Sequence, residues 1–367
     1  MAKKEKYDIV VVTNKILPYR EPLFKKMNDS FRCFFIITQQ DEKAVSSLKW
    51  LKKGNYYLPK KIRFKNIVPL TFVIAKLLSL RFKFILSVPT IYPEAWQAFL
   101  AAKIKKKKII FWDEEFEWKK SLKRKMIMPV TSFMNRHADY ILAPTDKHFK
   151  WLEKQGVSKK KFVLFPNVTN ISPKDVNFEE VKRIKEKYDL NKKRIVMYVG
   201  QLVERKGVNY LIDAYCEMIK ENDDIAKDTV LVIVGDGIMR NDLMKQSEKC
   251  SNRIIFTGYI NNKDLANYYA IADVGVVPSV NIGGMAEPYA LVVNEFLEFE
   301  KPVITTDMVG ASYYFFYDKD IAKEKNTRDL KNKLVRIIKG YKPELKNSDN
   351  LNNNYDIQFQ QIKRIIK

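Results

Sequence analysis

The chain has 367 residues, of which 46% are hydrophobic and 13% aromatic, so it has the composition of a folded protein with room for two domains. Three scattered cysteines and two histidines argue against a disulfide framework and a structural zinc site, and they indicate a reducing compartment. Residues 1–168 carry 36 Lys and Arg against 14 Asp and Glu, whereas the remainder carries 31 against 29. This asymmetry predicts a basic face on the first half, suited to an anionic membrane, a phosphorylated acceptor or a nucleic acid.

The start of the chain shows no secretion signal, because the first six residues lead directly into an apolar strand at 7–13. The longest apolar run, 68–80, is too short to span a bilayer. It predicts a core helix, with an amphipathic helix at a membrane surface as the alternative, because lysines and arginines flank it.

Further strands are predicted at 34–38, 84–88 and 109–111, each short and apolar. Polar residues follow two of the strands in this half, at the edge where open α/β sheets bind ligands: Asn14, Tyr19, Arg20, Asp113 and Glu114. The cationic run Lys105–Lys108 is open to two interpretations, a solubilising surface or a membrane or phosphate contact.

A composition change marks the domain boundary. Residues 168–175 are rich in Asn, Ser, Thr and Pro and follow an apolar strand at 162–167. We therefore expect domains at 1–168 and 169–345, followed by a helical tail at 346–367.

The second half alternates strands and helices, which predicts a parallel, doubly wound sheet. Strands are expected at 194–199, 229–234, 253–257, 274–277 and 303–306. The loops after them contain three short motifs: E-R-K-G at 204–207, G-D-G at 235–237 and F-T-G-Y at 256–259.

Residues 273–307 form a predicted strand, glycine loop, helix and strand. Glu287-Pro288 is typical of a helix start, and Glu295 would lie about 12 Å deeper on the same helix face. The amides of Tyr289, Ala290 and Leu291 would then receive an anion. The plainer alternative is that the first carboxylate is an ordinary first-turn acid and the second a surface charge.

The Glu-x7-Glu spacing, together with E-R-K-G, G-D-G and F-x-G-Y in this order, resembles the family-4 retaining glycosyltransferases of the GT-B fold. This resemblance implies two Rossmann-like, doubly wound domains that face a central cleft, with a C-terminal helix that crosses back to the first domain. Three departures from the family pattern are Gln201 in place of Arg, Ala290 in place of Gly, and no Gly-rich loop after the first strand.

The resemblance also assigns roles to individual residues. It implies catalytic roles for Glu287, Lys206 and Arg205. On the donor side, the residues expected to bind the nucleotide and its diphosphate are Gly200, Gln201, Gly235, Gly237, Tyr259, Tyr289, Ala290, Leu291 and Glu295. On the acceptor or sugar side they are Asn14, Tyr19, Arg20, Asp113 and Glu114.

The predicted function is the retaining transfer of a sugar from a UDP- or GDP-linked donor to a lipid-linked or glycan acceptor, in cell-surface glycan synthesis. No metal is expected, because cations and amides would take its place beside the diphosphate. We expect a cytoplasmic enzyme bound to the inner face of the membrane. The alternatives are a degenerate, non-catalytic relative, an epimerase or phosphorylase of the same fold, and a nucleic-acid-binding protein, which the lack of aromatics among Lys105–Lys108 disfavours.

Overall fold

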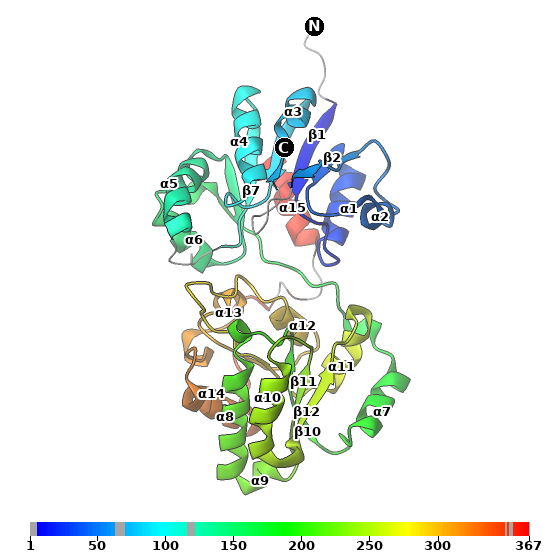
Figure 1. Ribbon diagram of the computed structural model, residues 1–367, viewed down its shortest axis with the longest axis vertical. Helices are drawn as coiled ribbons and strands as arrows, with labels where there is room; N and C mark the ends of the chain where they lie inside the picture. Colours follow the sequence, from blue (N-terminus) through cyan, green and yellow to red (C-terminus); the bar gives the residue numbers. More distant parts are fainter. Residues whose placement is uncertain (1–5, 63–69, 116–121, 349–350, 352–354, 367) are drawn as a thin grey trace. The chain divides into compact units, whose positions relative to one another are not determined.

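The computed structural model describes residues 6–62, 70–115, 122–348, 351 and 355–366. The chain divides into two compact units (Figure 1). The first unit comprises Met1–Phe116, Lys120–Pro166 and Tyr355–Lys367, and the second comprises Glu117–Lys119 and Asn167–Asn354. The main division thus falls between Pro166 and Asn167, just before residues 168–175, where the composition of the sequence changes.

The first unit is built on a seven-stranded parallel sheet in the order β3-β2-β1-β6-β7-β8-β9. Its strands are β1 (Tyr7–Thr13), β2 (Cys33–Ile37), β3 (Tyr56–Tyr57), β6 (Phe82–Ser87), β7 (Lys108–Trp112), β8 (Tyr140–Ala143) and β9 (Phe162–Leu164). Its helices are α1 (Glu21–Ser30), α2 (Glu42–Ser46), α3 (Ile74–Ser79), α4 (Pro93–Ile104), α5 (Leu122–His137), α6 (Asp146–Glu153) and α15 (Tyr355–Ile366). The apolar strands are buried on both faces, as parallel sheets require.

The apolar run at 68–80 does not form one helix, so that prediction is wrong. Within its described part, β5 (Leu70–Thr71) pairs in antiparallel fashion with β4 (Lys61–Ile62), and α3 begins only at Ile74. The amide of Gln97 explains the break, because its oxygen accepts from the backbone N–H groups of Val73 and Ile74 and caps the start of α3.

The last helix, α15, belongs to the first unit although it is the end of the chain. The Tyr355 hydroxyl donates to the carbonyl of Tyr19 at 2.8 Å, and the Gln358 amide donates to the carbonyl of Pro166 at 2.6 Å. Phe359 and Ile362 are buried in the core beneath α1. The expected return of the C-terminal helix to the first domain is confirmed.

The second unit has a five-stranded parallel sheet in the order β12-β11-β10-β13-β14. Its strands are β10 (Arg194–Val199), β11 (Thr229–Val234), β12 (Ile254–Gly258), β13 (Val274–Val277) and β14 (Val303–Thr305). Its helices are α7 (Phe178–Lys187), α8 (Val208–Glu221), α9 (Asp223–Ala226), α10 (Arg240–Ser247), α11 (Leu265–Ile271), α12 (Val292–Glu298), α13 (Gly310–Phe315) and α14 (Thr327–Ile338).

Each sheet has one point where the strand order reverses, between β1 and β6 in the first unit and between β10 and β13 in the second. In open α/β sheets, ligands bind at the carboxyl ends of the strands beside this switch point. The loops after β1, β6, β10 and β13 lie beside these points, and the loop after β7 is the next one along the first sheet, so these are the loops to inspect for function.

The cysteines differ from the sequence-based expectation, because Cys216 and Cys250 form a disulfide with their Cα atoms 5.3 Å apart. The bond joins α8 to the short 3-10 segment Glu248–Arg253. Cys33 is free and buried, and burial raises the pKa of its thiol to about 12. None of the described helices has the length and apolar character of a membrane-spanning segment.

Candidate functional site

The loops that follow β10 and β11 lie in direct backbone contact. The Leu202 amide donates to the carbonyl of Asp236 at 2.9 Å. A Cβ atom on Gly235 would lie 1.9 Å from the carbonyl oxygen of Gly200, and one on Gly237 would lie 2.3 Å from that of Leu202. Both glycines of the G-D-G motif are therefore needed for the two loops to approach, whatever else they do.

The loop after β13 is fixed against the E-R-K-G segment, which forms the 3-10 turn Glu204–Lys206. Gly207 takes a left-handed conformation with φ 64°, and a Cβ there would lie 2.1 Å from the carbonyl oxygen of Pro278. The Val280 amide donates to the carbonyl of Arg205 at 2.9 Å. These contacts hold the two loops on either side of the switch point at a set distance.

The three residues predicted to be catalytic meet at this point. Lys206 Nζ lies 2.8 Å from Glu287 Oε2, and Arg205 Nη1 contacts the same oxygen. The Glu287 side chain is 12% exposed, that of Lys206 16% and that of Arg205 38%. Two cations thus share one carboxylate, which leaves the cluster with a surplus positive charge at a solvent-accessible rim.

Glu287 does not begin a helix, so that prediction is wrong. It forms a parallel bridge with Val309, because its amide donates to the carbonyl of Met308 at 2.8 Å and its carbonyl accepts from Gly310 at 3.0 Å. Helix α12 begins only at Val292. The expectation that Glu287 and Glu295 share one helix face is wrong for the same reason.

Ala290 explains why the helix starts late. Its φ of 67° lies in the left-handed region, which a right-handed helix cannot include. The resemblance placed a glycine here in related proteins, and this backbone conformation supplies the physical reason for that preference. In this chain the conformation is held by an alanine, at a cost in backbone strain.

Glu295 lies in the interior, with 6% of its surface exposed. The Tyr269 hydroxyl donates to one of its oxygens, and the Thr169 hydroxyl donates to the other at 3.4 Å. Burial raises the pKa of this carboxyl, and the two hydrogen bonds oppose that shift. The structure engages both oxygens internally, so a contact with a ribose remains a prediction.

The other donor-side residues occupy different environments. Tyr289 is buried, and its hydroxyl donates to the carbonyl of Asn167 at 3.3 Å. Tyr259 is 72% exposed on the loop after β12. Gln201 is exposed, and its carbonyl accepts from the buried Tyr198 hydroxyl at 2.8 Å. Leu291 is the N-cap of α12.

The rim of the first unit holds a second arginine–glutamate pair. Arg20 Nη2 lies 2.5 Å from Glu114 Oε1, and the guanidinium stacks 4.3 Å from the ring centroid of Trp112. Asn14, at the end of β1, accepts a hydrogen bond from the Thr38 hydroxyl at 3.1 Å. The predicted acceptor-side residues thus lie on neighbouring loops of one sheet edge.

Asp113 is the most perturbed carboxyl of this rim. It is 6% exposed, and burial raises its pKa to about 7, although the Glu115 amide donates to it at 2.9 Å and opposes the shift. Tyr19 is affected in the same direction, because burial and the charge of Glu114 raise its pKa to about 12. Asp113 therefore changes its charge near neutral pH.

His148 is a positioning residue that the sequence reasoning missed. It is fully buried, and its Nε2 lies 2.7 Å from the carbonyl oxygen of Glu114. A carbonyl can only accept, so Nε2 carries a proton, and Nδ1 lies 2.7 Å from the Thr145 hydroxyl oxygen. The ring thus fixes the loop that carries Asp113 and Glu114.

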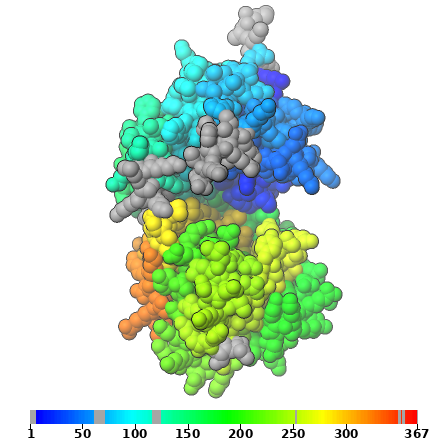
Figure 2. Space-filling model, viewed as in Figure 1, coloured from blue at the N-terminus to red at the C-terminus, as the bar shows by residue number. Residues whose placement is uncertain are grey.

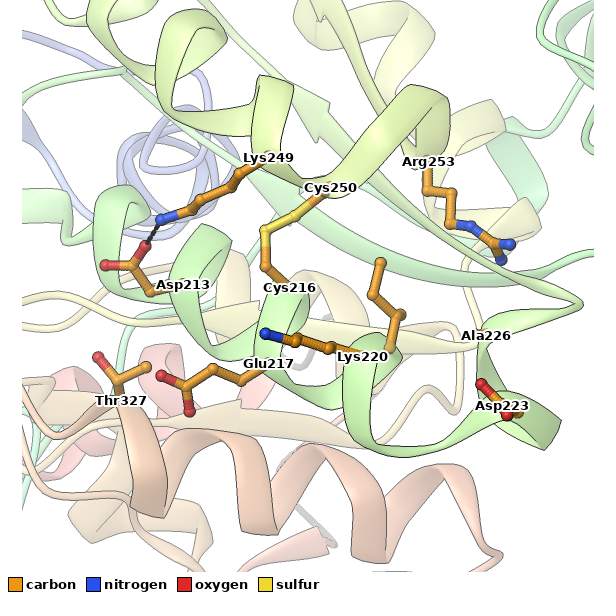
Figure 3. Close-up of a pocket in the computed structure, with 11 residues that line it drawn as sticks. Asp213, Cys216, Glu217, Lys220, Asp223, Ala226, Lys249, Cys250, Arg253 and Thr327 are labelled. Atoms are coloured by element: carbon orange, nitrogen blue, oxygen red, sulfur yellow. Dashed lines mark hydrogen bonds and ion pairs between the residues drawn. A yellow bond between two sulfur atoms is a disulfide. The ribbon is translucent and has the colours of Figure 1, made fainter.

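A cavity of about 690 Å³ lies elsewhere in the second unit (Figure 3). It is lined by the disulfide, by the second half of α8, and by Lys249 and Arg253. This is the amino-terminal side of the sheet, away from the loops where such sheets bind ligands. Among the described residues, no group of His, Cys, Asp and Glu side chains could hold a metal ion.

The two parallel Rossmann-like sheets, each with polar loops at its switch point, define the GT-B class of glycosyltransferase folds. The crystal structure of Anabaena Alr3699/HepE in complex with UDP is similar in fold, with a TM-score of 0.74. It is 15% identical in sequence, and the match covers 97% of this chain and 98% of that one.

Sequence comparison agrees with the fold. The family described as glycosyl transferases group 1 matches residues 180–356. An uncharacterized 41.2 kDa protein in the cps region of Klebsiella pneumoniae is 25% identical, over 58% of this chain and 56% of its own length. The alpha-monoglucosyldiacylglycerol synthase of Streptococcus pneumoniae is 26% identical, over 39% of this chain and 34% of its own length. The chain thus spans about half or less of these two curated relatives, and the structural comparison supports the GT-B fold.

Proposed function

We propose that the protein is a retaining glycosyltransferase, of the family-4 type, which transfers a sugar from a nucleoside-diphosphate sugar to a hydroxyl of a lipid-linked or glycan acceptor. The observation that carries this proposal is the cluster of Arg205, Lys206 and Glu287 at the switch point of the second sheet. Two cations with one carboxylate between them suit a diphosphate whose negative charge grows as the sugar departs. The similar HepE structure is described as a complex with UDP, which supports a nucleotide donor.

The geometry suggests how the cluster would act. A diphosphate beside Lys206 and Arg205 would share their charge with Glu287. The carboxylate would then be free to accept from sugar hydroxyls and to stabilise the oxocarbenium-like transition state. In the retaining mechanism that we propose, the leaving diphosphate takes the proton of the acceptor hydroxyl on the same face of the sugar. The amides of Ala290 and Leu291 and the two cations would make a metal ion unnecessary.

We propose that the acceptor binds to the first unit. Arg20, Glu114 and Asp113 present hydrogen-bonding groups that suit sugar hydroxyls. The excess of basic residues before residue 168 suits a substrate on an anionic surface, so we propose cell-surface glycan synthesis at the inner face of the cytoplasmic membrane. The similarity to a synthase of a glycosylated diacylglycerol supports a lipid-linked acceptor.

The test is a thermal-shift panel with UDP, GDP, ADP and CMP and their common sugars, each with and without EDTA. Binding to the native state raises the midpoint, by about 2.7 kcal/mol of stability at a ligand concentration of 100 times Kd. One nucleotide should shift the wild type, with EDTA present, and should shift Lys206→Ala much less. Lys245→Ala, an exposed lysine of α10, is the matched control and should behave as the wild type.

Two outcomes would count against the proposal. If no nucleotide shifted the midpoint at millimolar concentration, a degenerate relative without catalysis would explain the fold better. If the shift survived in Lys206→Ala, the diphosphate would bind elsewhere.

A further inference from the structure

The first unit carries an exposed apolar face on α4 and α5. On α4, Leu100 and Ile104 lie one turn apart and are 50% and 57% exposed. On α5, Met126, Val130 and Phe133 are 71%, 41% and 48% exposed, and their spacing of four and three residues places them in one stripe. We call these five residues the apolar face. A stripe of this kind normally faces a protein core, but here it faces solvent.

The two helices that carry these stripes lie side by side. Phe99 packs edge-on against Phe133, with ring centroids 6.1 Å apart. Lys103 Nζ donates to the carbonyl of His137, the last residue of α5, at 2.8 Å. The ribbon and space-filling views show the cyan α4 next to the teal α5 on the same flank of the unit (Figures 1 and 2).

Cations predominate among the charges around the apolar face. Helix α5 contains no acidic residue, and the one acid of α4, Glu94, is 1% exposed and accepts from the Thr71 hydroxyl. Glu115 is paired with Arg124. The exposed cations on and beside these helices are Lys103, Lys106, Lys108, Lys125 and Arg136.

We propose that the apolar face, with its surrounding cations, docks the first unit on a bilayer that contains anionic lipid. The aliphatic and aromatic side chains would enter the boundary between headgroups and acyl chains, and the lysines would remain at the phosphate level. A protein partner fits less well, because lysine is depleted from protein interfaces. A nucleic acid would use the cations but not the aliphatic side chains.

This inference rests on the proposed function in one respect, because a lipid-linked acceptor is what would require the enzyme at a membrane. Its test needs no donor and no turnover. The full-length chain is floated with vesicles of phosphatidylcholine alone and with vesicles containing roughly one third phosphatidylglycerol. We expect binding to the anionic vesicles, which weakens as salt is raised because exposed charges are screened.

The decisive variant combines Leu100→Ser, Ile104→Ser and Met126→Ser. These side chains are at least half exposed, so the fold should survive, as a thermal midpoint within a few degrees of the wild type would show. Vesicle affinity should fall by at least about tenfold, because the apolar surface that would enter the bilayer is lost. The matched control is Phe178→Ser, Ile238→Ser and Met244→Ser, which are 80%, 89% and 43% exposed in the second unit and should leave binding unchanged.

A second variant tests the charges separately. Lys106→Gln with Lys125→Gln should weaken binding to anionic vesicles and flatten its salt dependence. Absence of wild-type binding to anionic vesicles, or equal binding by the Leu100, Ile104 and Met126 variant, would overturn the proposal. A dimer that the Leu100, Ile104 and Met126 variant disrupts would also overturn it, because a second copy of the chain would then cover the apolar face. Tight binding of duplex DNA without vesicle binding would overturn it as well. A nucleotide-induced thermal shift measured on the same samples separates a failure of this inference from a failure of the proposed function.

Discussion

The switch points of the two sheets offer a direct comparison. At or beside each of them, the rim carries an arginine–glutamate pair, but the charge balance differs. In the second unit, two cations share Glu287 and leave a positive charge to spare. In the first, Arg20 is matched by Glu114, and the further carboxyl of Asp113 is buried beside them. The same topology therefore presents one rim suited to a polyanion and another suited to hydroxyl groups.

The largest effect is expected from removing the charge of Glu287, the carboxylate that the two cations share. Glu287→Gln keeps the shape but loses the charge that stabilises a developing cation, so turnover should fall by about 10²–10³-fold. Nucleotide binding should persist or strengthen, because Lys206 and Arg205 lose a competing anion. Release of free nucleotide from donor sugar and the thermal shift with nucleotide measure the two effects.

Glu204→Gln is the matched control, since Glu204 lies in the same 3-10 turn but is exposed. It should keep wild-type turnover. Full turnover in Glu287→Gln would remove Glu287 from the mechanism.

The protonation of Asp113 on the rim of the first unit can be tested by measuring stability at different pH values. The pKa of Asp113 in the folded protein, about 7, lies above its ordinary value of 3.8, so the native state holds more protons than the unfolded state between these values. The stability contributed by protonated Asp113 is therefore full below about pH 4 and is lost as the pH rises to about 7. In the wild type, this loss should lower the free energy of unfolding by on the order of 3 kcal/mol between about pH 4 and pH 7, and Asp113→Asn should remove the decline. Urea denaturation at several pH values measures it.

Glu42→Gln, at an exposed position of α2, controls for the loss of any carboxylate and should keep the decline. A decline of equal size in Asp113→Asn would show that other groups cause it.

His148 allows a smaller test of how the first rim is held. His148→Ala should lower the free energy of unfolding by about 2 kcal/mol, because the Glu114 carbonyl and the Thr145 hydroxyl lose a buried partner. His137→Ala, at the exposed end of α5, should cost less than about 1 kcal/mol. Chemical denaturation of both variants compares them, and equal losses would contradict the assigned role of His148.

The smallest expected effect concerns Ala290. Ala290→Gly should raise stability by about 0.5–1 kcal/mol, because glycine adopts a φ of 67° without strain. Ala266→Gly, within α11, should instead be destabilising. Thermal midpoints of the two variants should move in opposite directions, and a loss of stability in Ala290→Gly would show that the methyl group matters more than the strain.

Much of this molecule could be predicted from local pattern. Alternating apolar strands and helices were sufficient for the α/β fold, and the resemblance carried by the E-R-K-G and Glu-x7-Glu motifs assigned Lys206 and Glu287 to one site. The predictions that were wrong depend on contacts with residues that are distant in the sequence. Glu287-Pro288 looks like a helix start because local signals cannot reveal the bridge to Val309.

The same limit applies to the cysteine pair and to His148. Cys216 and Cys250 are 34 residues apart, and so are His148 and the carbonyl of Glu114. Neither pairing follows from composition or spacing. Only the packing of the sheet and its helices brings these groups together.

The return of α15 to the first unit has a consequence for synthesis on the ribosome. The second unit is formed largely from one continuous stretch, Asn167–Asn354, and can complete its core while the chain is still being made. The first unit begins earlier but must wait, because Phe359, Ile362 and Ile365 of its core are synthesised only after the whole of the second unit. A message that stops before the codons of α15 would therefore damage the unit that is encoded first.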